Sequence, residues 1–347
     1  MAPKRILVCS TQVPYVRGGA ELLVEGLVQA LCEHGHIVEL VQLPFSWAPD
    51  KTAIVKGCLA WRLLELEYIQ SQSIDQVICT KFPSYVARHP NKVVWLVHQH
   101  RQAYDWYGTA YSDFTYREED REVRQVVQRI DRRCLGEARR IYTISQNVSR
   151  RLAHYNALRS TPLYPPSRYR EQLHPGSYGD YVLYLGRLDR AKRVDLLIAA
   201  LAQMNGPLRA VIAGAGAERK ALEALARQHR VADRVRFAGF VDDEALVALY
   251  AGARAVFYAP IDEDYGYATV EAFYAARPVV TSDDAGGVLE FVTHRQTGLV
   301  SAADPAAIAA HLDELAADAA LAERLGQAGR KRVEGITWDK VVRALVL

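Results

Sequence analysis

Short apolar runs alternate along the chain with segments whose apolar residues recur at helical spacing. Residues 5–9 form the first run, and Leu23, Leu27 and Leu31 then repeat every fourth position. A second apolar run follows at residues 37–43. A strand, a glycine-containing loop, a helix and a strand within about 40 residues predict a β-α-β unit.

Three further apolar runs lie in the first half, and polar residues follow each of them. They occupy residues 76–79, 93–97 and 141–144. Apolar strands that alternate with helices are typical of a parallel sheet covered on both faces.

The pattern restarts after residues 162–180, a stretch rich in Pro, Gly and Tyr that we interpret as an interdomain connection. The restarted pattern predicts strands at 181–185, 209–213, 235–237, 255–258 and 279–280, helices at 193–202, 218–228, 243–250 and 268–275, and two helices broken near Asp318 in residues 305–333. A single core stops growing near about 250–300 residues. We therefore expect domains at 1–170 and 171–335, with 336–347 forming a helix that packs back toward the first domain.

Composition narrows the class of protein. Half of the 347 residues are hydrophobic and 24% are charged, as in a soluble globular protein, and the net charge of +3 is too small to indicate nucleic-acid binding. The charge is uneven: residues 1–175 carry 23 basic and 17 acidic side chains, whereas residues 176–347 carry 20 and 23. This imbalance again indicates two units.

The five cysteines all lie in the first half, and none forms a C-x-x-C pair. A metal site and a disulfide framework are therefore both disfavoured, and a reducing cytosol is expected. The apolar run near the N-terminus is too short for a signal peptide, and no run reaches the roughly 18 apolar residues of a membrane span. We expect a cytoplasmic protein, with peripheral attachment to the inner face of a membrane as an option.

Residues 116–140 are strongly charged, with eight arginines among six acidic residues. One interpretation is a solvated helix face with ion pairs between successive turns. The other is a basic surface for an anionic membrane or a diphosphate-bearing acceptor. Both interpretations are open at this stage.

Candidate chemistry begins in the first loop, Arg17-Gly18-Gly19-Ala20-Glu21. Paired glycines before a helix N-terminus allow close approach of a phosphate. A turn that needs small residues explains the same sequence, which is neither a Walker P-loop nor G-x-G-x-x-G.

Two glycine-containing loops follow strands of the second half. In residues 186–192, Arg187 and Lys192 lie where ligands bind in open α/β sheets, and two such cations suit a diphosphate. An exposed basic loop is the alternative. The G-x-G at Gly214 and Gly216 is weak evidence for a dinucleotide site, because Arg219 stands where the third glycine is needed.

The acidic segment 262–272 is the most informative. A loop carrying Glu263 leads into a helix that carries Glu271, and carboxylates of this kind can accept the hydroxyls of a polyhydroxylated ligand. Backbone N–H groups at residues 268–270 suit an adjacent anion. An acidic cluster that complements the helix dipole is the alternative explanation.

His98 lies in Val97-His98-Gln99-His100-Arg101, directly after a predicted strand. A single histidine is more often structural than catalytic, but two histidines with Gln and Arg at a strand's carboxyl end favour a functional role. Carboxylates at metal-ligand spacing are absent there, so zinc is a poor explanation.

Taken in order, RGGAE, GRLDRAK, IAGAG and Glu263-x7-Glu271 resemble the family-4 retaining glycosyltransferases. Gly286-Gly287 and Ser145-Gln146-Asn147 are similar to further segments of that family. The resemblance covers nearly the whole chain and implies the GT-B fold, two Rossmann-like doubly wound parallel-sheet domains that face each other across a cleft. It implies transfer of a hexose from a nucleotide-sugar to a glycan or lipid-linked acceptor, in a bacterial surface-glycan pathway. GDP-mannose or a UDP-hexose is the expected donor, and no metal ion or other cofactor is expected.

The resemblance also implies roles for individual residues. Arg187 and Lys192 would hold the diphosphate, Glu263 the sugar hydroxyls and Glu271 the ribose, while His98 would reach the sugar, with His100 as the second choice. The remaining expected donor contacts are Gly18, Gly19, Gly214, Phe240 or Val241 at the base, and Tyr265, Gly266, Tyr267, Ala268, Thr269 and Val270.

The chain departs from the family in two places. Asp264 and Tyr265 stand where the family has Gly-Phe, and the sequence printed after Trp338 is short. A GT-B enzyme of other chemistry, such as a nucleotide-sugar epimerase, and a non-catalytic nucleotide-sugar binder are the competing hypotheses. A dehydrogenase is disfavoured by the missing third glycine.

Overall fold

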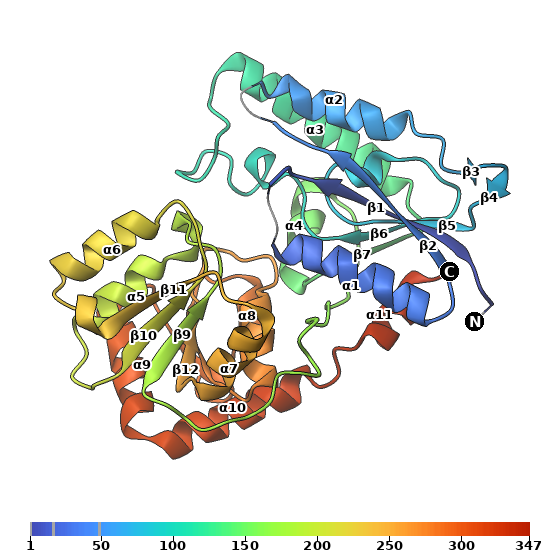
Figure 1. The fold of residues 1–347 in the computed structure, drawn as a ribbon. Helices are drawn as coiled ribbons and strands as arrows, with labels where there is room; N and C mark the ends of the chain where they lie inside the picture. The colour runs from blue at the N-terminus through green and yellow to red at the C-terminus, as the bar shows by residue number, and fades with distance from the viewer. Residues whose placement is uncertain (1, 16–17, 48–49) are drawn as a thin grey trace. The chain divides into compact units, whose positions relative to one another are not determined.

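The computed structural model describes residues 2–15, 18–47 and 50–347, and these form two compact units. Unit 1 comprises Met1–Pro166 together with Ile336–Leu347, and unit 2 comprises Ser167–Gly335. The chain therefore passes between the units twice, once at Pro166–Ser167 and again at Gly335–Ile336. Each unit is built on its own parallel sheet (Figure 1).

Unit 1 has a six-stranded sheet in the order β2-β1-β5-β6-β7-β8, with every pair parallel. Three of the strands, β1, β5 and β6, are short apolar runs that are almost fully buried, as expected for a sheet covered on both faces. The strands are β1 Arg5–Gln12, β2 Ile37–Pro44, β5 Gln76–Cys79, β6 Lys92–Leu96, β7 Arg140–Thr143 and β8 Thr161–Pro162.

The helices of unit 1 include two that the hydrophobic pattern does not predict, α2 and α4. In α2 the apolar face is only Ile54, Cys58 and Trp61, which is too sparse to stand out from its surroundings. A small antiparallel hairpin, β3 Tyr68–Ile69 with β4 Gln72–Ser73, was also not predicted. The helices are α1 Gly19–Glu33, α2 Thr52–Arg62, α3 Glu118–Gly136, α4 Gln146–Asn156 and α11 Trp338–Leu345.

The terminal helix α11 belongs to unit 1 and packs against α1. The ring of Trp338 lies against Gly26 of α1, where an added Cβ would be 2.4 Å from the indole ring. The same ring makes an edge-on contact with Trp95, with ring centroids 6.2 Å apart. Gln76 of β5 donates to the carbonyl of Leu345 at 2.6 Å. These contacts anchor the end of the chain to the sheet of unit 1.

The arginine-rich segment forms α3, and its buried face consists of Asp120, Val127, Asp131, Cys134 and Leu135. Its arginines are exposed or half-buried, so the segment is a solvated helix with one packed side. In the described part of the chain no helix is both long and apolar enough to cross a membrane. All five cysteines have free thiols.

Unit 2 has a second six-stranded parallel sheet, in the order β11-β10-β9-β12-β13-β14. Both predicted sheets are thus present, and the fold class is confirmed. The strands are β9 Tyr181–Leu185, β10 Arg209–Ala213, β11 Val235–Gly239, β12 Ala255–Phe257, β13 Val279–Ser282 and β14 Gly298–Ser301.

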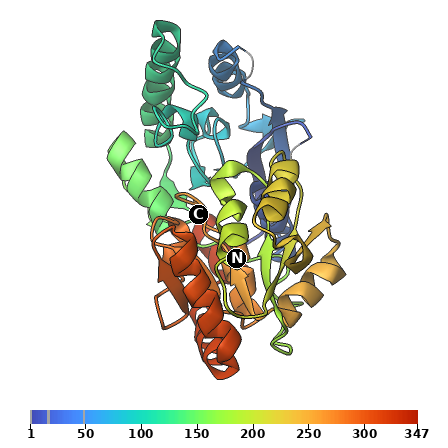
Figure 2. The ribbon, with the colours of Figure 1, turned by 90° about the vertical axis from the view of Figure 1, so that its left-hand side faces the viewer.

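Helices lie on both sides of this sheet (Figure 1). Helix α5 packs against α6 and α9, and α8 packs against α10. The two alanine-rich helices α9 and α10 follow each other directly along the chain and are separated at Asp318 as the sequence predicts, because the Asp318 side chain caps the second helix (Figure 2). The helices are α5 Val194–Leu201, α6 Arg219–Gln228, α7 Asp243–Gly252, α8 Tyr267–Tyr274, α9 Pro305–Ala317 and α10 Ala319–Val333.

Candidate active site

The candidate site lies in unit 2, where the direction of winding of the sheet reverses. Strand β9 is the first of its sheet, β10 and β11 extend to one side of it, and β12 to β14 extend to the other. The carboxyl ends of β9 and β12 therefore border a topological switch point, which is where open α/β sheets bind ligands. The loops after these two strands carry Arg187 and Lys192, and Glu263, respectively.

The loop after β9, residues 186–192, rests on the glycines that follow β10. Gly214 has φ +131°, and a Cβ at this position would lie 1.9 Å from the carbonyl oxygen of Gly186. At Gly216 a Cβ would lie 2.2 Å from the carbonyl oxygen of Leu188, whose N–H donates to Ala215. The G-x-G motif thus lets two loops approach each other closely. The donor contact expected of Gly214 stays a prediction.

Two of the cations of this loop, Arg187 and Lys192, differ in their surroundings. The Arg187 side chain is 63% exposed, and its nearest carboxylate oxygen, on Asp189, is 3.6 Å away. Lys192 is largely buried and donates to the Oε2 atom of Glu263 and, at 3.2 Å, to the hydroxyl of Tyr258. The loop therefore offers Arg187 to solvent and holds Lys192 beside a carboxylate.

Arg193 joins the two loops, and sequence reasoning missed it. It has a left-handed backbone, φ +50°, immediately before α5. Its guanidinium donates to the carbonyls of Ala259 and Pro260 and forms a two-pronged pair with Asp284. Because Arg193 follows Lys192 in the loop after β9 and these charge-assisted bonds reach the segments after β12 and β13, Arg193 ties the position of Lys192 to that of Glu263. The only sequence signal for Arg193 is its place beside Lys192 in a basic motif. That motif indicates a ligand-binding residue and not a residue that holds two loops together.

The loop after β12 is held by the glycine pair 286–287. The N–H of Glu263 donates to Ala285 at 3.2 Å, and its carbonyl accepts from Gly287 at 2.8 Å. A Cβ on Gly286, which has φ +63°, would lie 2.7 Å from the N atom of Glu263. The G-G-V-L-E segment that resembles the family's sequence therefore packs directly on the backbone of the carboxylate.

Helix α8 begins immediately after this loop, and Gly266 is its N-cap residue with φ +87°. Tyr265 is buried, and its ring makes edge-on contacts with Tyr267 and Phe291. One detail of the expectation is wrong: the N–H of Thr269 is not available to an anion, because it closes a turn to the carbonyl of Gly266 at 2.9 Å. The contacts expected of the neighbouring Ala268 and Val270, both buried, stay predictions.

Glu271 lies on α8 and is only 5% exposed. Its Oε1 atom accepts from Ser167 at 2.8 Å, and its Oε2 atom accepts from Tyr250 at 3.0 Å. Burial raises the pKa of this carboxyl to about 7, although both hydroxyl bonds act to lower it. Sequence reasoning missed Ser167 and Tyr250, since neither stands in a recognisable motif.

Phe240 follows β11 directly and is 89% exposed, whereas Val241 is half-buried. A solvent-exposed phenylalanine at the carboxyl edge of a sheet offers a flat apolar surface to a ring. The contact with a nucleobase expected of Phe240 or Val241 stays a prediction.

In unit 1, Gly18 and Gly19 begin α1, while Arg17 lies outside the described residues. The N–H of Gly18 donates to Glu21 at 2.9 Å, and the other oxygen of Glu21 pairs with Lys81. The loop thus satisfies part of its own helix end. The phosphate contact expected of Gly19 stays a prediction.

The two histidines after β6 have different environments. His98 is half-buried, and its Nδ1 atom lies 2.7 Å from the carbonyl of Gln99. His100 is buried among aromatic rings, and this burial lowers the pKa of its imidazole to about 3. His100 is therefore a neutral core residue, which leaves His98 as the candidate of the pair.

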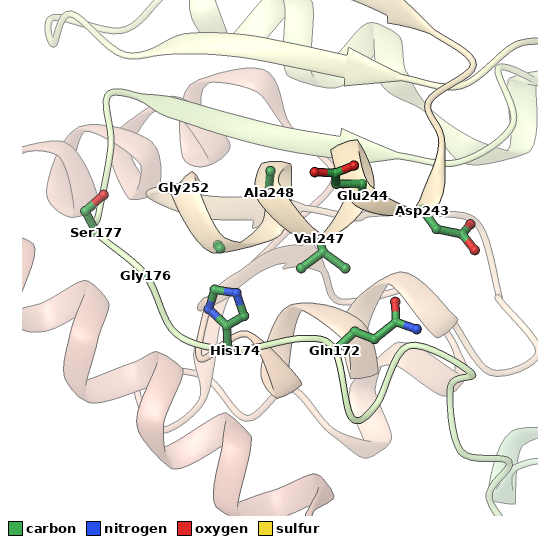
Figure 3. Close-up of a pocket in the computed structure, with 10 residues that line it drawn as sticks. Gln172, His174, Gly176, Ser177, Asp243, Glu244, Val247, Ala248 and Gly252 are labelled. Atoms are coloured by element: carbon green, nitrogen blue, oxygen red, sulfur yellow. The ribbon is translucent and has the colours of Figure 1, made fainter.

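The described residues also form an open groove of about 780 Å³ in unit 2. His174 and Gln172 line one side, and Val247 of α7 lines the other (Figure 3). None of the predicted site residues lines this groove. Within the described ranges, no cluster of three or more His, Cys, Asp or Glu side chains is arranged to bind a metal.

Comparison with known proteins places these observations in a family context. Residues 167–332 match the model of the family described as glycosyl transferases group 1. An uncharacterized glycosyltransferase of Methanocaldococcus jannaschii is 34% identical over 171 residues, 48% of this chain and 43% of the relative. Glycogen synthase of Mycobacterium tuberculosis is 36% identical over 168 residues, 47% of this chain and 40% of the relative. The matched part thus spans about two fifths of the length of these curated relatives.

Solved structures are similar over the whole chain. A sucrose-phosphate synthase from Thermosynechococcus elongatus has a TM-score of 0.79 at 21% identity, covering 99% of this chain and 97% of the other. The Anabaena protein HepE, in complex with UDP-glucose, has a TM-score of 0.73 at 18% identity and covers 99% and 98%. These similarities establish the fold.

Proposed function

We propose that this chain is a glycosyl transferase of group 1, the family whose model matches residues 167–332, and that it transfers a hexose from a nucleotide-sugar to a glycan or lipid-linked acceptor. The transfer retains the configuration at the reacting carbon and uses protein cations in place of a metal ion. GDP-mannose or a UDP-hexose is the proposed donor.

The observation that carries the proposal is the grouping of opposite charges at the switch point of unit 2. Arg187 is presented to solvent, and Lys192 and Glu263 lie side by side at the ends of adjacent strands. Cations suit a diphosphate, and a carboxylate suits sugar hydroxyls. That HepE has been solved with UDP-glucose supports a nucleotide-sugar as donor.

The proposed chemistry needs charge stabilisation more than a nucleophile. The bond from the anomeric carbon to the diphosphate oxygen breaks, and a bond to the acceptor oxygen forms on the same face. The acceptor's proton passes to the departing phosphate oxygen. Arg187 and Lys192 stabilise the negative charge that develops on that phosphate, and preorganised groups of this kind supply a large share of catalysis.

Other contacts of the proposal concern binding. Glu271 accepts the ribose hydroxyls and Phe240 or Val241 lies against the base, while Glu263 holds the sugar. The roles that the resemblance implies for Gly19 at the phosphate and for His98 at the sugar stay predictions. Each of these roles is part of the proposal.

The test is nucleotide release from a panel of UDP-, GDP- and ADP-sugars, with and without a glycan acceptor. We expect release that depends on acceptor, and a loss of about 100-fold or more in turnover for Arg187→Ala and for Lys192→Ala, the effect typical of removing one charge-stabilising group. Arg190→Ala is the matched control. It removes a cation from the same loop, with a side chain 81% exposed and no proposed role, and should leave turnover within about twofold.

The outcomes separate the competing functions. Release without any transfer to acceptor would indicate other nucleotide-sugar chemistry, and binding without release would indicate a binding protein. Wild-type turnover in both Arg187→Ala and Lys192→Ala would refute the assignment of the site.

A further inference from the structure

Two buried tyrosines lie beneath the charged groups of the candidate site. Tyr184 is on β9, and Tyr258 directly follows β12, the neighbouring strand. Their rings stack with centroids 6.5 Å apart and an interplanar angle of 30°. The Tyr184 hydroxyl reaches the loop after β9, and the Tyr258 hydroxyl reaches both loops of the site.

The Tyr258 hydroxyl bridges Lys192 and Glu263. It accepts a hydrogen bond from the Nζ atom of Lys192 at 3.2 Å and donates one to the Oε2 atom of Glu263 at 3.1 Å. The directions are fixed, because an ammonium group can only donate and an ionised carboxylate can only accept. Burial, with Glu263 adding to it, raises the pKa of Tyr258 well above its usual value, so the hydroxyl keeps the proton that it donates.

The Tyr184 hydroxyl supports the other cation through the backbone. It donates to the carbonyl oxygen of Arg187 at 2.7 Å. Since the ring is fixed in the core between strands, the carbonyl of Arg187 is held at a set distance from the sheet. This bond restrains the part of the loop from which the exposed guanidinium projects.

Packing alone does not require either hydroxyl. A phenylalanine would fill nearly the same volume at both positions and would keep the stacked contact. What the hydroxyls add is a fixed spacing among the groups proposed to act on donor phosphate and donor sugar. Small displacements of such groups have large effects on rate.

We propose that Tyr258 is a positioning residue for Lys192 and Glu263, and that Tyr184 is a positioning residue for the loop that carries Arg187. Neither tyrosine contacts substrate; both act through the charged groups. This inference rests on the proposed function, because it assigns the residues that align that same site.

The test compares three phenylalanine variants of the full chain in the nucleotide-release assay. Tyr258→Phe should lower kcat about tenfold and change the KM for donor less than about threefold, since the bridge aligns groups that act on the departing phosphate. Tyr184→Phe should lower kcat about threefold to fivefold. Tyr181→Phe is the control: its hydroxyl donates to the carbonyl of Leu249 at 2.7 Å from the opposite end of β9, so it should lower thermal stability but not kcat.

A double variant separates positioning from simple destabilisation. If Tyr258 acts largely through Lys192, adding Tyr258→Phe to Lys192→Ala should lower the residual rate by less than about twofold. A structural role would instead lower the melting temperature without a selective effect on kcat. Tyr184→Phe offers a second measurement if Tyr258→Phe folds poorly.

The possible failures are distinguishable. If the wild type releases no nucleotide from any nucleotide-sugar, the proposed function is refuted and this inference with it. If the wild type turns over and both Tyr258→Phe and Tyr184→Phe keep the wild-type kcat, this inference alone is refuted.

Discussion

The buried carboxyl of Glu271 predicts a specific dependence of stability on pH. Its pKa is raised from the ordinary value of 4.5 to about 7 because the folded protein removes it from water. A raised carboxyl pKa means that the folded state binds the proton more tightly than the unfolded state. The stability that the neutral form contributes is therefore fully present below pH 4.5 and is lost as the pH rises to about 7.

The size of the effect follows from the shift. Each pKa unit corresponds to 1.36 kcal/mol, so the shift corresponds to about 3 kcal/mol. Glu271→Gln keeps the shape and one carbonyl acceptor but cannot ionise. Relative to their difference at pH 4.5, the variant should become more stable than the wild type by about 3 kcal/mol at pH 8.

The assay is thermal unfolding of both proteins from pH 4.5 to pH 8. The difference between them isolates this group, because other carboxyls with lowered pKa values, such as those of Asp120 and Glu137, contribute equally to both. For a unit of this size about 3 kcal/mol corresponds to a change of roughly 10 °C in the difference between the two melting temperatures. Parallel curves for wild type and Glu271→Gln across this range would refute the reasoning.

Ser167→Ala tests the direction in which the Ser167 hydrogen bond moves the pKa of Glu271. The bond from Ser167 lowers the pKa of Glu271, so its removal should raise that pKa further. The pH window in which stability is lost should then extend to higher pH. A window displaced to lower pH would contradict the geometry of this bond.

Three further predictions concern packing and charge. Gly214→Ala should destabilise unit 2 by about 2–3 kcal/mol in thermal unfolding, because its Cβ would meet the Gly186 carbonyl. The control Gly136→Ala has open space around the added Cβ and should not destabilise the protein. Equal melting temperatures for the two variants would contradict this prediction. Trp338→Ala should destabilise unit 1 by about 3 kcal/mol in the same assay through loss of its contacts with Gly26 and Trp95, and an unchanged melting temperature would show that α11 contributes little. If the exposed arginines in and after α3 attach to anionic membranes, the wild-type protein should sediment with anionic vesicles at low salt. Sedimentation of the protein should fall sharply when Arg132, Arg133, Arg139 and Arg140 are changed to Gln, and should persist when they are changed to Lys. No sedimentation of the wild type would refute the membrane interpretation.

Much of the fold was predictable from the sequence because its strands are short apolar runs bounded by polar loops. The strands β5 and β9 begin and end at the predicted residues, and the break at Asp318 follows from a capping side chain. Helices α2 and α4 escaped prediction since their buried faces are short and their sequences mix polar and apolar residues. The strand β14 was also missed, because its four residues begin with Gly and end with Ser and so form only a very short apolar run.

The charged residues of the candidate site were predictable from the sequence, but the residues that hold them in position were not. Arg187, Lys192 and Glu263 stand directly after apolar runs, so the sequence indicates the edge of the sheet at which they gather. The residues that hold these groups in place are Arg193 and Tyr258. In the sequence Arg193 looks like part of a basic loop, and Tyr258 looks like part of an apolar strand. Which partner such a side chain selects depends on the order of strands in space, and no local pattern encodes that order.

The double passage of the chain between the units has a consequence for synthesis. Unit 2 is a continuous stretch, Ser167–Gly335, so all of its residues are synthesised before residues 336–347. Unit 1 is discontinuous, and it lacks the helix that covers part of α1 until those residues emerge. We therefore expect unit 1 to complete its packing only after the whole of unit 2 has been synthesised, with the face of α1 around Gly26 uncovered until then.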